Sequence, residues 1–160
     1  MATGDHDLPP GDLEAFTPEI WDEMMAVNLR GPYLVARAAA DHLRRSQWGR
    51  IVNIGSTLGL GDWYMDRAFA TSKAAVVPLT RYLAASLAPD VSVNCVAPGL
   101  MVETGLGSGG SDEFVQRWRD RSALGVTTSV DDVASQVVSL CKSGTITGQT
   151  VVVDGGINFS

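Results

Sequence analysis

The chain has 160 residues, of which 45% are apolar and 19% charged, a length that suits one globular domain with a core and hardly two. Its net charge of −6 excludes the positive field that attracts nucleic-acid phosphates. No apolar run approaches the ~20 residues of a membrane span, and residues 1–15, expected to be a leader, lack the features of a secretory signal. We therefore expect a cytoplasmic protein that binds neither nucleic acid nor membrane.

The first predicted element is a helix over about residues 18–45. Thr17 can cap its free amides, Pro18 suits the first turn, and Glu19 favours the positive end of the helix dipole. Apolar residues follow at the spacing of one buried face: Ile20, Met24, Val27, Leu34 and Ala38. Gly31-Pro32 predicts a kink, because proline lacks a backbone N–H.

Three short segments rich in β-branched residues, 50–54, 91–96 and 150–153, are typical of strands buried on both faces. Helical patterns separate them over about 66–88 and from the cap at Ser129 to about 140. Strands that alternate with helices favour right-handed crossovers and a parallel sheet covered on both faces. The predicted fold class is α/β, with about three parallel strands.

Residues 101–128 interrupt this alternation. They hold four glycines at 105–110, followed by a short helical pattern around Phe114, Val115 and Trp118. Long loops in compact domains are often functional, so we interpret this segment as a substrate loop or lid; an ordinary surface excursion is the alternative.

The two cysteines, Cys95 and Cys141, belong to no CxxC or Cys/His group. The sequence therefore predicts neither a metal site nor a disulfide framework, and both cysteines are expected to be buried thiols.

Ligands of open α/β sheets bind beyond the carboxyl ends of the strands. The residues at those ends are Gly55-Ser56, Pro98-Gly99 and Asp154-Gly155-Gly156. Phe69 and Lys73 lie early on the helix that follows Ser56, and their spacing of four places them on one helical face.

Five segments, in this order, resemble motifs of the short-chain dehydrogenase/reductase family, over roughly residues 14–158. They are Val-Asn-Leu-Arg-Gly at 27–31, Asn-Ile-Gly-Ser at 53–56, Ala-Thr-Ser-Lys at 70–73, Val-Asn-Cys-Val-Ala-Pro-Gly at 93–99 and Thr-Gly-Gln-Thr-Val-Val-Val-Asp-Gly-Gly at 147–156. The resemblance implies a single partial domain over 1–160, a truncated Rossmann-like doubly wound sheet. It also implies NAD(P)-linked oxidoreduction of a small carbonyl or alcohol.

The resemblance also implies roles for individual residues. Ser56 would hold the substrate carbonyl, Lys73 would contact the nicotinamide ribose, and Asn28 would support a proton-relay water. The remaining cofactor contacts, with NAD or NADP, would come from Pro98, Gly99, Met101 and Thr104. Each of the three polar residues could instead have a purely structural role. Ser56 would then end the strand, Lys73 would be a solvated residue on a helix face, and Asn28 would link a helix to a loop.

Two departures from the family pattern make autonomous redox activity doubtful. The catalytic tyrosine belongs four residues before the lysine, where this chain has Phe69, and a positioned acid–base group supplies about 10²–10⁴-fold. Tyr64, nine residues before Lys73, cannot occupy the same helical position. The family's opening strand and glycine-rich phosphate-binding turn are also not found ahead of the strand at 50–54, so we expect weak cofactor binding.

Without a preceding strand, the strand at 50–54 is expected to have an open edge, which residues 1–15 or a partner would cover. The helices at 18–45 and 66–88 resemble the family's dimer-forming helices, so a homodimer or tetramer is expected. The predicted function is thus that of a truncated oxidoreductase. The alternatives are a non-redox cyclase, isomerase or lyase that reuses the pocket, and a non-catalytic dimerising scaffold.

Overall fold

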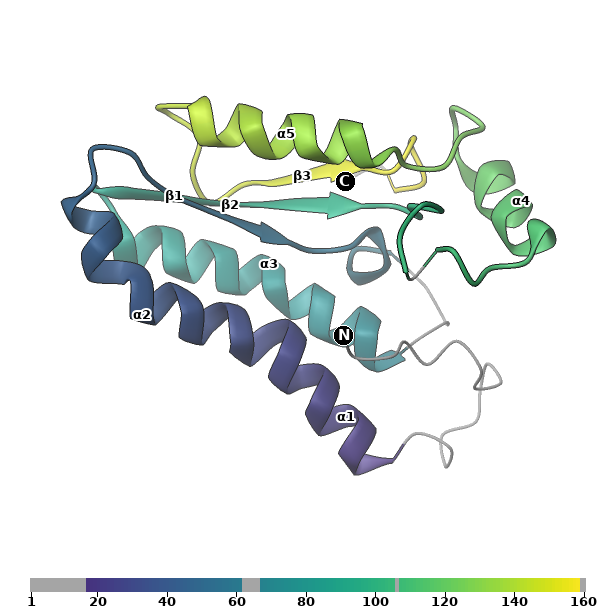
Figure 1. The fold of residues 1–160 in the computed structure, drawn as a ribbon, viewed down its shortest axis with the longest axis horizontal. Helices are drawn as coiled ribbons and strands as arrows, with labels where there is room; N and C mark the ends of the chain where they lie inside the picture. Colours follow the sequence, from purple (N-terminus) through teal and green to yellow (C-terminus); the bar gives the residue numbers. More distant parts are fainter. Residues whose placement is uncertain (1–16, 62–66, 106, 159–160) are drawn as a thin grey trace.

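The computed structural model describes residues 17–61, 67–105 and 107–158 (Figure 1). The elements in chain order are α1 (Pro18–Met25), the π-helical segment η1 (Ala26–Arg30), α2 (Gly31–Arg45), β1 (Gly49–Ile54), the 3-10 helix η2 (Thr57–Gly59), α3 (Arg67–Leu87), β2 (Val91–Pro98), α4 (Asp112–Arg121), α5 (Val130–Lys142) and β3 (Thr150–Val153). The predicted strands and the main helices are therefore confirmed, with ends that differ by a few residues.

The three strands form one parallel sheet in the order β1-β2-β3. In register, Ile54 of β1 lies opposite Val96 of β2, and Pro98 of β2 lies opposite Val153 of β3. Helix α5 covers one face of the sheet, while α2 and α3 cover the other (Figure 1). The α/β fold with parallel strands that the sequence predicted is confirmed.

Side chains of each strand alternate between these two faces, as the twofold period of a strand requires. On the α2 and α3 side, the core contains Ala36, Leu83, Ala84, Leu87, Val91 and Val93. On the α5 side, it contains Val96, Val133 and Leu140, with Val52, Met101 and Val151 among the residues packed against them. Burial of apolar surface on both faces, worth about 25 cal/mol per Å², fixes the sheet between its helical layers.

The helical run from Pro18 to Arg45 changes its hydrogen-bonding pattern rather than simply kinking at Gly31-Pro32. Pro32 has no N–H to donate to the carbonyl of Asn28, four residues earlier. The Gly31 N–H instead bonds to the carbonyl of Ala26, five residues back, which is the π-helical pattern. The sequence located the irregularity, but the structure places it over Ala26–Arg30, with Asn28 at its centre.

Within the described residues β1 pairs with β2 alone, so the other edge of β1 has no partner strand there. Ile54 at the end of β1 is 44% exposed. The prediction that residues 1–15 cover this edge falls outside the described part of the chain.

The described residues of 101–128 form turns and then α4, which lies beyond the carboxyl ends of the strands (Figure 1). The segment is tied at its base, where the Thr128 N–H donates to the carbonyl of Leu100 at 2.9 Å. Trp118 of α4 is buried, and its ring lies 6.3 Å from that of Phe114 in an edge-to-face arrangement. The predicted short helix is confirmed; the role of the segment as a lid stays a prediction.

Of the two cysteines, Cys95 is buried in β2 as expected, but Cys141 is exposed and the prediction for it was wrong. Val133, Val137 and Leu140 turn one face of α5 toward the sheet. Cys141 follows Leu140 by one residue, a rotation of about 100° that carries its side chain away from the sheet. No helix of the described residues is long and apolar enough to cross a membrane, and no cluster of potential metal ligands occurs among them.

Candidate functional site

The carboxyl end of β1 continues into a tight turn that packs on α3. Ser56 adopts an extended conformation and caps η2, with its Oγ accepting a hydrogen bond from the Leu58 N–H at 3.2 Å. At Gly59, an added Cβ would lie 2.5 Å from the backbone nitrogen of Ala74, so only glycine permits this approach to α3. The turn thereby brings Ser56 to the amino-terminal half of α3, where Phe69 and Lys73 lie.

Lys73 reaches back from α3 to the end of β1. Its Nζ donates to the carbonyl of Ile54 at 2.8 Å and lies 5.6 Å from the centroid of the Phe69 ring. Phe69 and Lys73 therefore share one face of α3, as their spacing predicted. Burial lowers the pKa of the Lys73 amine, an effect that the nearby thiol of Cys95 opposes.

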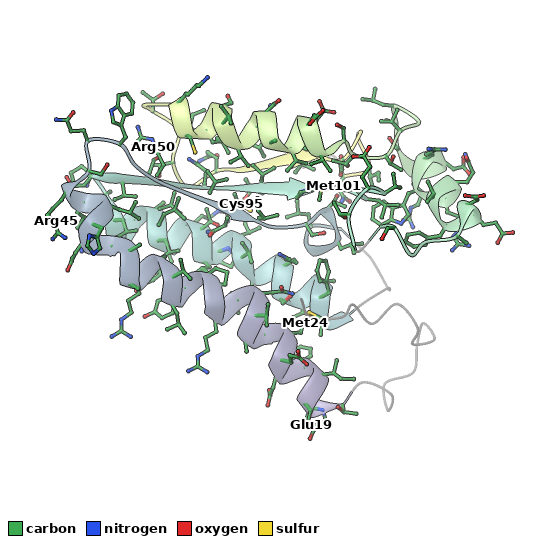
Figure 2. All side chains as sticks on the ribbon, in the orientation of Figure 1. Glu19, Met24, Arg45, Arg50, Cys95 and Met101 are labelled. Carbon is green, nitrogen blue, oxygen red and sulfur yellow. The ribbon has the colours of Figure 1, made fainter. Side chains whose placement is uncertain are left out.

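Cys95, labelled in Figure 2, lies on the α3 side of β2 behind this amine. Burial raises the pKa of its thiol, and this outweighs the lowering effects of the Gly55 backbone, Thr150, Lys73 and Thr80. An added Cβ at Gly55 would lie 2.9 Å from the Cys95 sulfur, so the thiol is enclosed by the start of the turn. Cys95 is therefore a neutral neighbour of Lys73 at neutral pH.

Asn28 connects the π-helical segment to α3. Its Nδ2 donates to Ser72 Oγ at 3.1 Å and lies 3.0 Å from the sulfur of Met24, a buried residue labelled in Figure 2. Ser72 in turn donates to the carbonyl of Phe69 at 2.7 Å. Asn28 is thus joined through Ser72 to the first turns of α3, which carry Phe69 and Lys73.

Pro98 and Gly99 lie at the carboxyl end of β2, level with Ser56, since Ile54 pairs with Val96. An added Cβ at Gly99 would lie 2.6 Å from Thr128 Oγ1, so close packing accounts for this glycine.

Met101 and Thr104 form a turn just beyond β2, where the N–H and hydroxyl of Thr104 both donate to the Met101 carbonyl. The Met101 side chain, labelled in Figure 2, packs into the core on the α5 side. The Met101 side chain is thus part of the core, and its carbonyl is used by the Thr104 turn.

A buried hydrogen-bond network joins the ends of β1 and β3. Thr57 Oγ1 donates to Asp154 Oδ2 at 2.6 Å, and the carboxylate also accepts from the backbone N–H groups of Gly156, Ile157 and Asn158. The Asn158 side-chain amide contacts both oxygens of Thr57. This network holds the turn that carries Ser56 against the end of β3.

The Lys73 amine thus lies at the end of β1 with Phe69 beside it, and Asn28 is joined to α3 through Ser72. Pro98, Gly99, Met101 and Thr104 lie at or just beyond the end of the next strand. Sequence reasoning missed Ser72 and Cys95 as neighbours of this site. The position of Ser72, three residues after Phe69 on one helical face, was the available signal. Tyr64 falls outside the described residues.

A family model described as Enoyl-(Acyl carrier protein) reductase matches residues 4–158. The 3-oxoacyl-[acyl-carrier-protein] reductase FabG of Aquifex aeolicus is 37% identical over 140 residues, which make up 86% of this chain and 56% of that protein. The short-chain dehydrogenase/reductase homolog YusR of Bacillus subtilis is 34% identical over 128 residues, or 80% of this chain and 98% of that protein.

Solved structures show the same architecture. The gluconate 5-dehydrogenase of Burkholderia cenocepacia, in complex with NADP and tartrate, matches with a TM-score of 0.86 and 32% identity. The match covers 97% of this chain and 62% of that one. The chain thus spans little more than half the length of the Aquifex reductase and of this structural relative.

Proposed function

Because the chain belongs to the short-chain dehydrogenase/reductase family, we propose that its site serves NAD(P)-linked oxidoreduction of a small carbonyl or alcohol. The observation that carries the proposal is the position of the Lys73 amine. It is held by the Ile54 carbonyl at 2.8 Å, two residues before Ser56, and Asn28 is joined to the same helix through Ser72. This places an amine donor and a hydroxyl at the end of a strand, where ligands of such sheets bind.

The polar groups present suit the nicotinamide end of a dinucleotide. In the hydrogen bonds of the described residues, Ser56 Oγ acts as an acceptor, which leaves its proton for a substrate carbonyl. Lys73 would hold the nicotinamide ribose, with Pro98, Gly99, Met101 and Thr104 beside the ring. A bound NADH or NADPH would supply hydride to the carbonyl carbon.

Proton transfer is the step that the sequence leaves in question, because the position four residues before Lys73 holds Phe69 rather than an acid–base side chain. Phe69 occupies the face of α3 beside Lys73, and its ring has no proton to give or take. A positioned acid–base group contributes about 10²–10⁴-fold to a rate. We therefore propose a redox activity in truncated form, slow when the chain acts alone, with Asn28 and Ser56 able only to orient water and substrate.

Cofactor binding is tested by isothermal titration of NADH and NADPH into the purified chain, after light scattering has established its oligomeric state. The described residues supply contacts for the nicotinamide end only, so we expect no saturation below millimolar cofactor. Micromolar binding would contradict the proposed weak affinity. Lys73→Met is expected to abolish the residual binding, and Lys142→Met, at an exposed position on α5, is the matched control.

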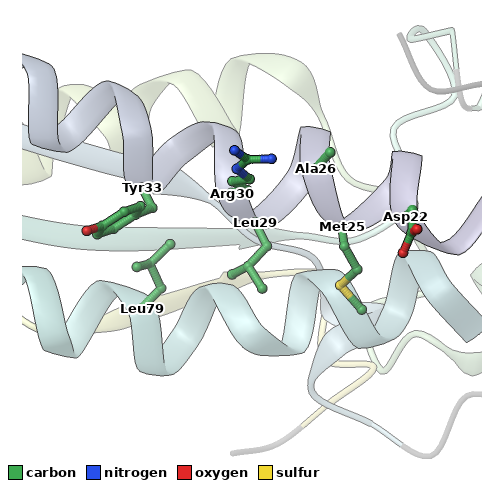
Figure 3. Close-up of a pocket in the computed structure, with 7 residues that line it drawn as sticks. All are labelled: Asp22, Met25, Ala26, Leu29, Arg30, Tyr33 and Leu79. Atoms are coloured by element: carbon green, nitrogen blue, oxygen red, sulfur yellow. The ribbon is translucent and has the colours of Figure 1, made fainter.

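Association through the helices at 18–45 and 66–88 is a second proposal. Between α1, η1, α2 and α3 lies an open groove of about 690 Å³ (Figure 3). Its lining is mostly apolar and comprises Asp22, Met25, Ala26, Leu29, Arg30, Tyr33 and Leu79. Two further apolar side chains of the same helical run, Val27 and Leu34, are exposed. Such a surface favours a homodimer or tetramer over a monomer in solution.

Light scattering of Tyr33→Glu tests this association, because the change puts a charge into the groove. We expect the mass to fall to that of the monomer, while Val138→Glu, at an exposed position on α5, leaves the assembly unchanged. A monomeric wild-type chain would contradict the proposal. If Tyr33→Glu abolishes a cellular function that Ser56→Ala and Lys73→Ala do not affect, the non-catalytic scaffold is favoured instead.

A non-redox cyclase, isomerase or lyase is the remaining candidate, favoured by one observation. Phe69 stands where the family has its acid–base tyrosine, but the half-buried Lys73 amine remains, held by the Ile54 carbonyl two residues before Ser56. Catalysis without added nicotinamide would identify this use of the site.

A further inference from the structure

Two opposite charges, on Asp22 and Arg30, line the groove between α1, η1, α2 and α3 (Figure 3). Both residues are exposed, and they lie eight positions apart, about 12 Å along a helix at 1.5 Å per residue. That separation is too large for an ion pair within one chain. The ion pair found among the described residues joins Arg44 to Asp41, so neither Asp22 nor Arg30 has a charged partner there.

The groove lining between these two charges is apolar and consists of Met25, Ala26 and Leu29. Ala26 is the midpoint in sequence between Asp22 and Arg30, and its small side chain is exposed. In a dimer with twofold symmetry, residue i of one copy meets residue j of the other, and j meets i. A twofold axis at Ala26 would therefore bring Asp22 of each copy to Arg30 of the other. It would also place the small alanine side chains where the two helices come closest.

Charges are distributed unevenly along the whole helical run. The α1 end carries the acidic residues Glu19, Asp22 and Glu23, whereas the run beyond Ala26 carries the basic residues Arg30, Arg37, Arg44 and Arg45. If two copies pack antiparallel, the acidic end of each run lies over the basic part of the other. A parallel arrangement would instead place acid on acid and base on base, which is unfavourable.

We infer that two copies pack antiparallel through this groove, with Asp22 of each copy paired with Arg30 of the other. The inference rests on the association proposed above, and it adds the orientation of the two copies and the charges that select it. Exposed ion pairs add little to affinity, so the apolar lining supplies the attraction. The two charges act mainly on specificity, because any other register brings like charges together or leaves these charges unpaired.

Charge exchange between the two positions tests the pairing. A dimer of Asp22→Arg has four positive charges at these positions and a dimer of Arg30→Asp has four negative ones. Each variant alone should therefore self-associate at least about tenfold more weakly than wild type. In an equal mixture of the two variants every contact again joins opposite charges. A heterodimer should then form at concentrations where neither variant associates by itself.

Native mass spectrometry, with a peptide tag on one variant, tells the heterodimer from the homodimers. Asp90→Arg and Arg119→Asp, at exposed positions outside the groove, are the matched controls and should leave association at the wild-type level. If the two groove variants associate as wild type does, or if their mixture stays as weak as each alone, the pairing of Asp22 with Arg30 is overturned.

Salt dependence gives a second measurement that needs no charge reversal. Salt screens exposed ion pairs, so wild-type association should weaken several-fold from low to physiological ionic strength, and Asp22→Asn combined with Arg30→Gln should remove most of this dependence. The outcome also separates this inference from the association on which it rests. Dissociation by Tyr33→Glu without any effect of the charge variants would leave the association standing and overturn its orientation, whereas a monomeric wild-type chain would contradict both.

Discussion

Thr57 and Asp154 are 97 positions apart in sequence, yet Thr57 Oγ1 donates to Asp154 Oδ2 at 2.6 Å and both residues are buried. The bond joins the turn after β1 to the end of β3, across the intervening strand β2. Hydrogen bonds to charged groups are stronger than neutral ones, so this contact helps to hold the Ser56 turn in place.

Thr57→Val keeps the shape of the side chain but removes the hydroxyl. Asp154 then loses one of its donors inside the protein, and we expect the free energy of unfolding to fall by about 2 kcal/mol. Urea denaturation followed by circular dichroism measures the change. The exposed Thr145→Val is the control, expected to stay within about 0.5 kcal/mol of the wild type. Equal stabilities of the two variants would show that the network contributes nothing.

Asn28→Asp tests the connection between the π-helical segment and α3. The carboxylate cannot donate to Ser72 Oγ, whose own proton is used by the Phe69 carbonyl. We expect a loss of about 1–2 kcal/mol in the free energy of unfolding, because a donor is replaced by a charged acceptor. Gln47→Glu, a similar change at an exposed loop residue, should have little effect. If the midpoint of urea unfolding is the same for Asn28→Asp as for wild type, the role assigned to this hydrogen bond is contradicted.

Lys73→Met should alter the pH dependence of stability. Burial lowers the pKa of Lys73 in the folded chain, so the unfolded chain binds the proton more tightly. The charged amine therefore destabilises the fold at neutral pH, and this penalty disappears as the pH rises through the unfolded pKa of about 10.4. The free energy of unfolding of Lys73→Met, relative to wild type, should therefore be higher at pH 7 than at a pH near 10.4.

Thermal unfolding of wild type and variant across that pH range measures the difference. Lys142→Met provides the control, since its exposed side chain pays no burial penalty. A Lys73→Met difference that does not change with pH would show that the amine is not desolvated.

The thiols of Cys141 and Cys95 should differ in reactivity, the first reacting in the native chain and the second only after unfolding. Cys141 is exposed, whereas Cys95 is buried and burial raises its pKa. The thiolate is the reactive form, so a disulfide reagent at mildly alkaline pH should modify Cys141 at once and Cys95 only after unfolding. Cys141→Ser should leave no fast-reacting thiol in the native chain. A fast reaction of that variant would contradict the enclosure of Cys95 between β2 and the turn at Gly55.

The strands were predictable because their signal is local. Runs such as Ile51-Val52 and Val151-Val152 have few structural alternatives when turn residues flank them. The π-helical pattern of Ala26–Arg30 was less accessible. It depends on the N–H that Pro32 lacks, which marks an irregularity but does not specify its form.

The site was predictable where residues lie close in sequence or belong to a recognisable motif. The shared face of Phe69 and Lys73 follows from a spacing of four. The contact between Thr57 and Asp154 depends on how three strands align, which neither segment encodes by itself. The burial of Cys95 and the exposure of Cys141 likewise depend on which face of an element meets the sheet.

Phe69→Tyr tests the account most directly, because it returns a phenol to the face of α3 that carries Lys73. The measurement is the rate of carbonyl reduction at millimolar NADPH, followed by the loss of reduced nicotinamide and compared with wild type. If Ser56, Lys73 and Asn28 form an oxidoreductase site that lacks only its acid–base group, the rate should rise about 10²–10⁴-fold, and adding Lys73→Met should cancel the gain. No increase in a folded Phe69→Tyr chain would show that these residues do not form such a site.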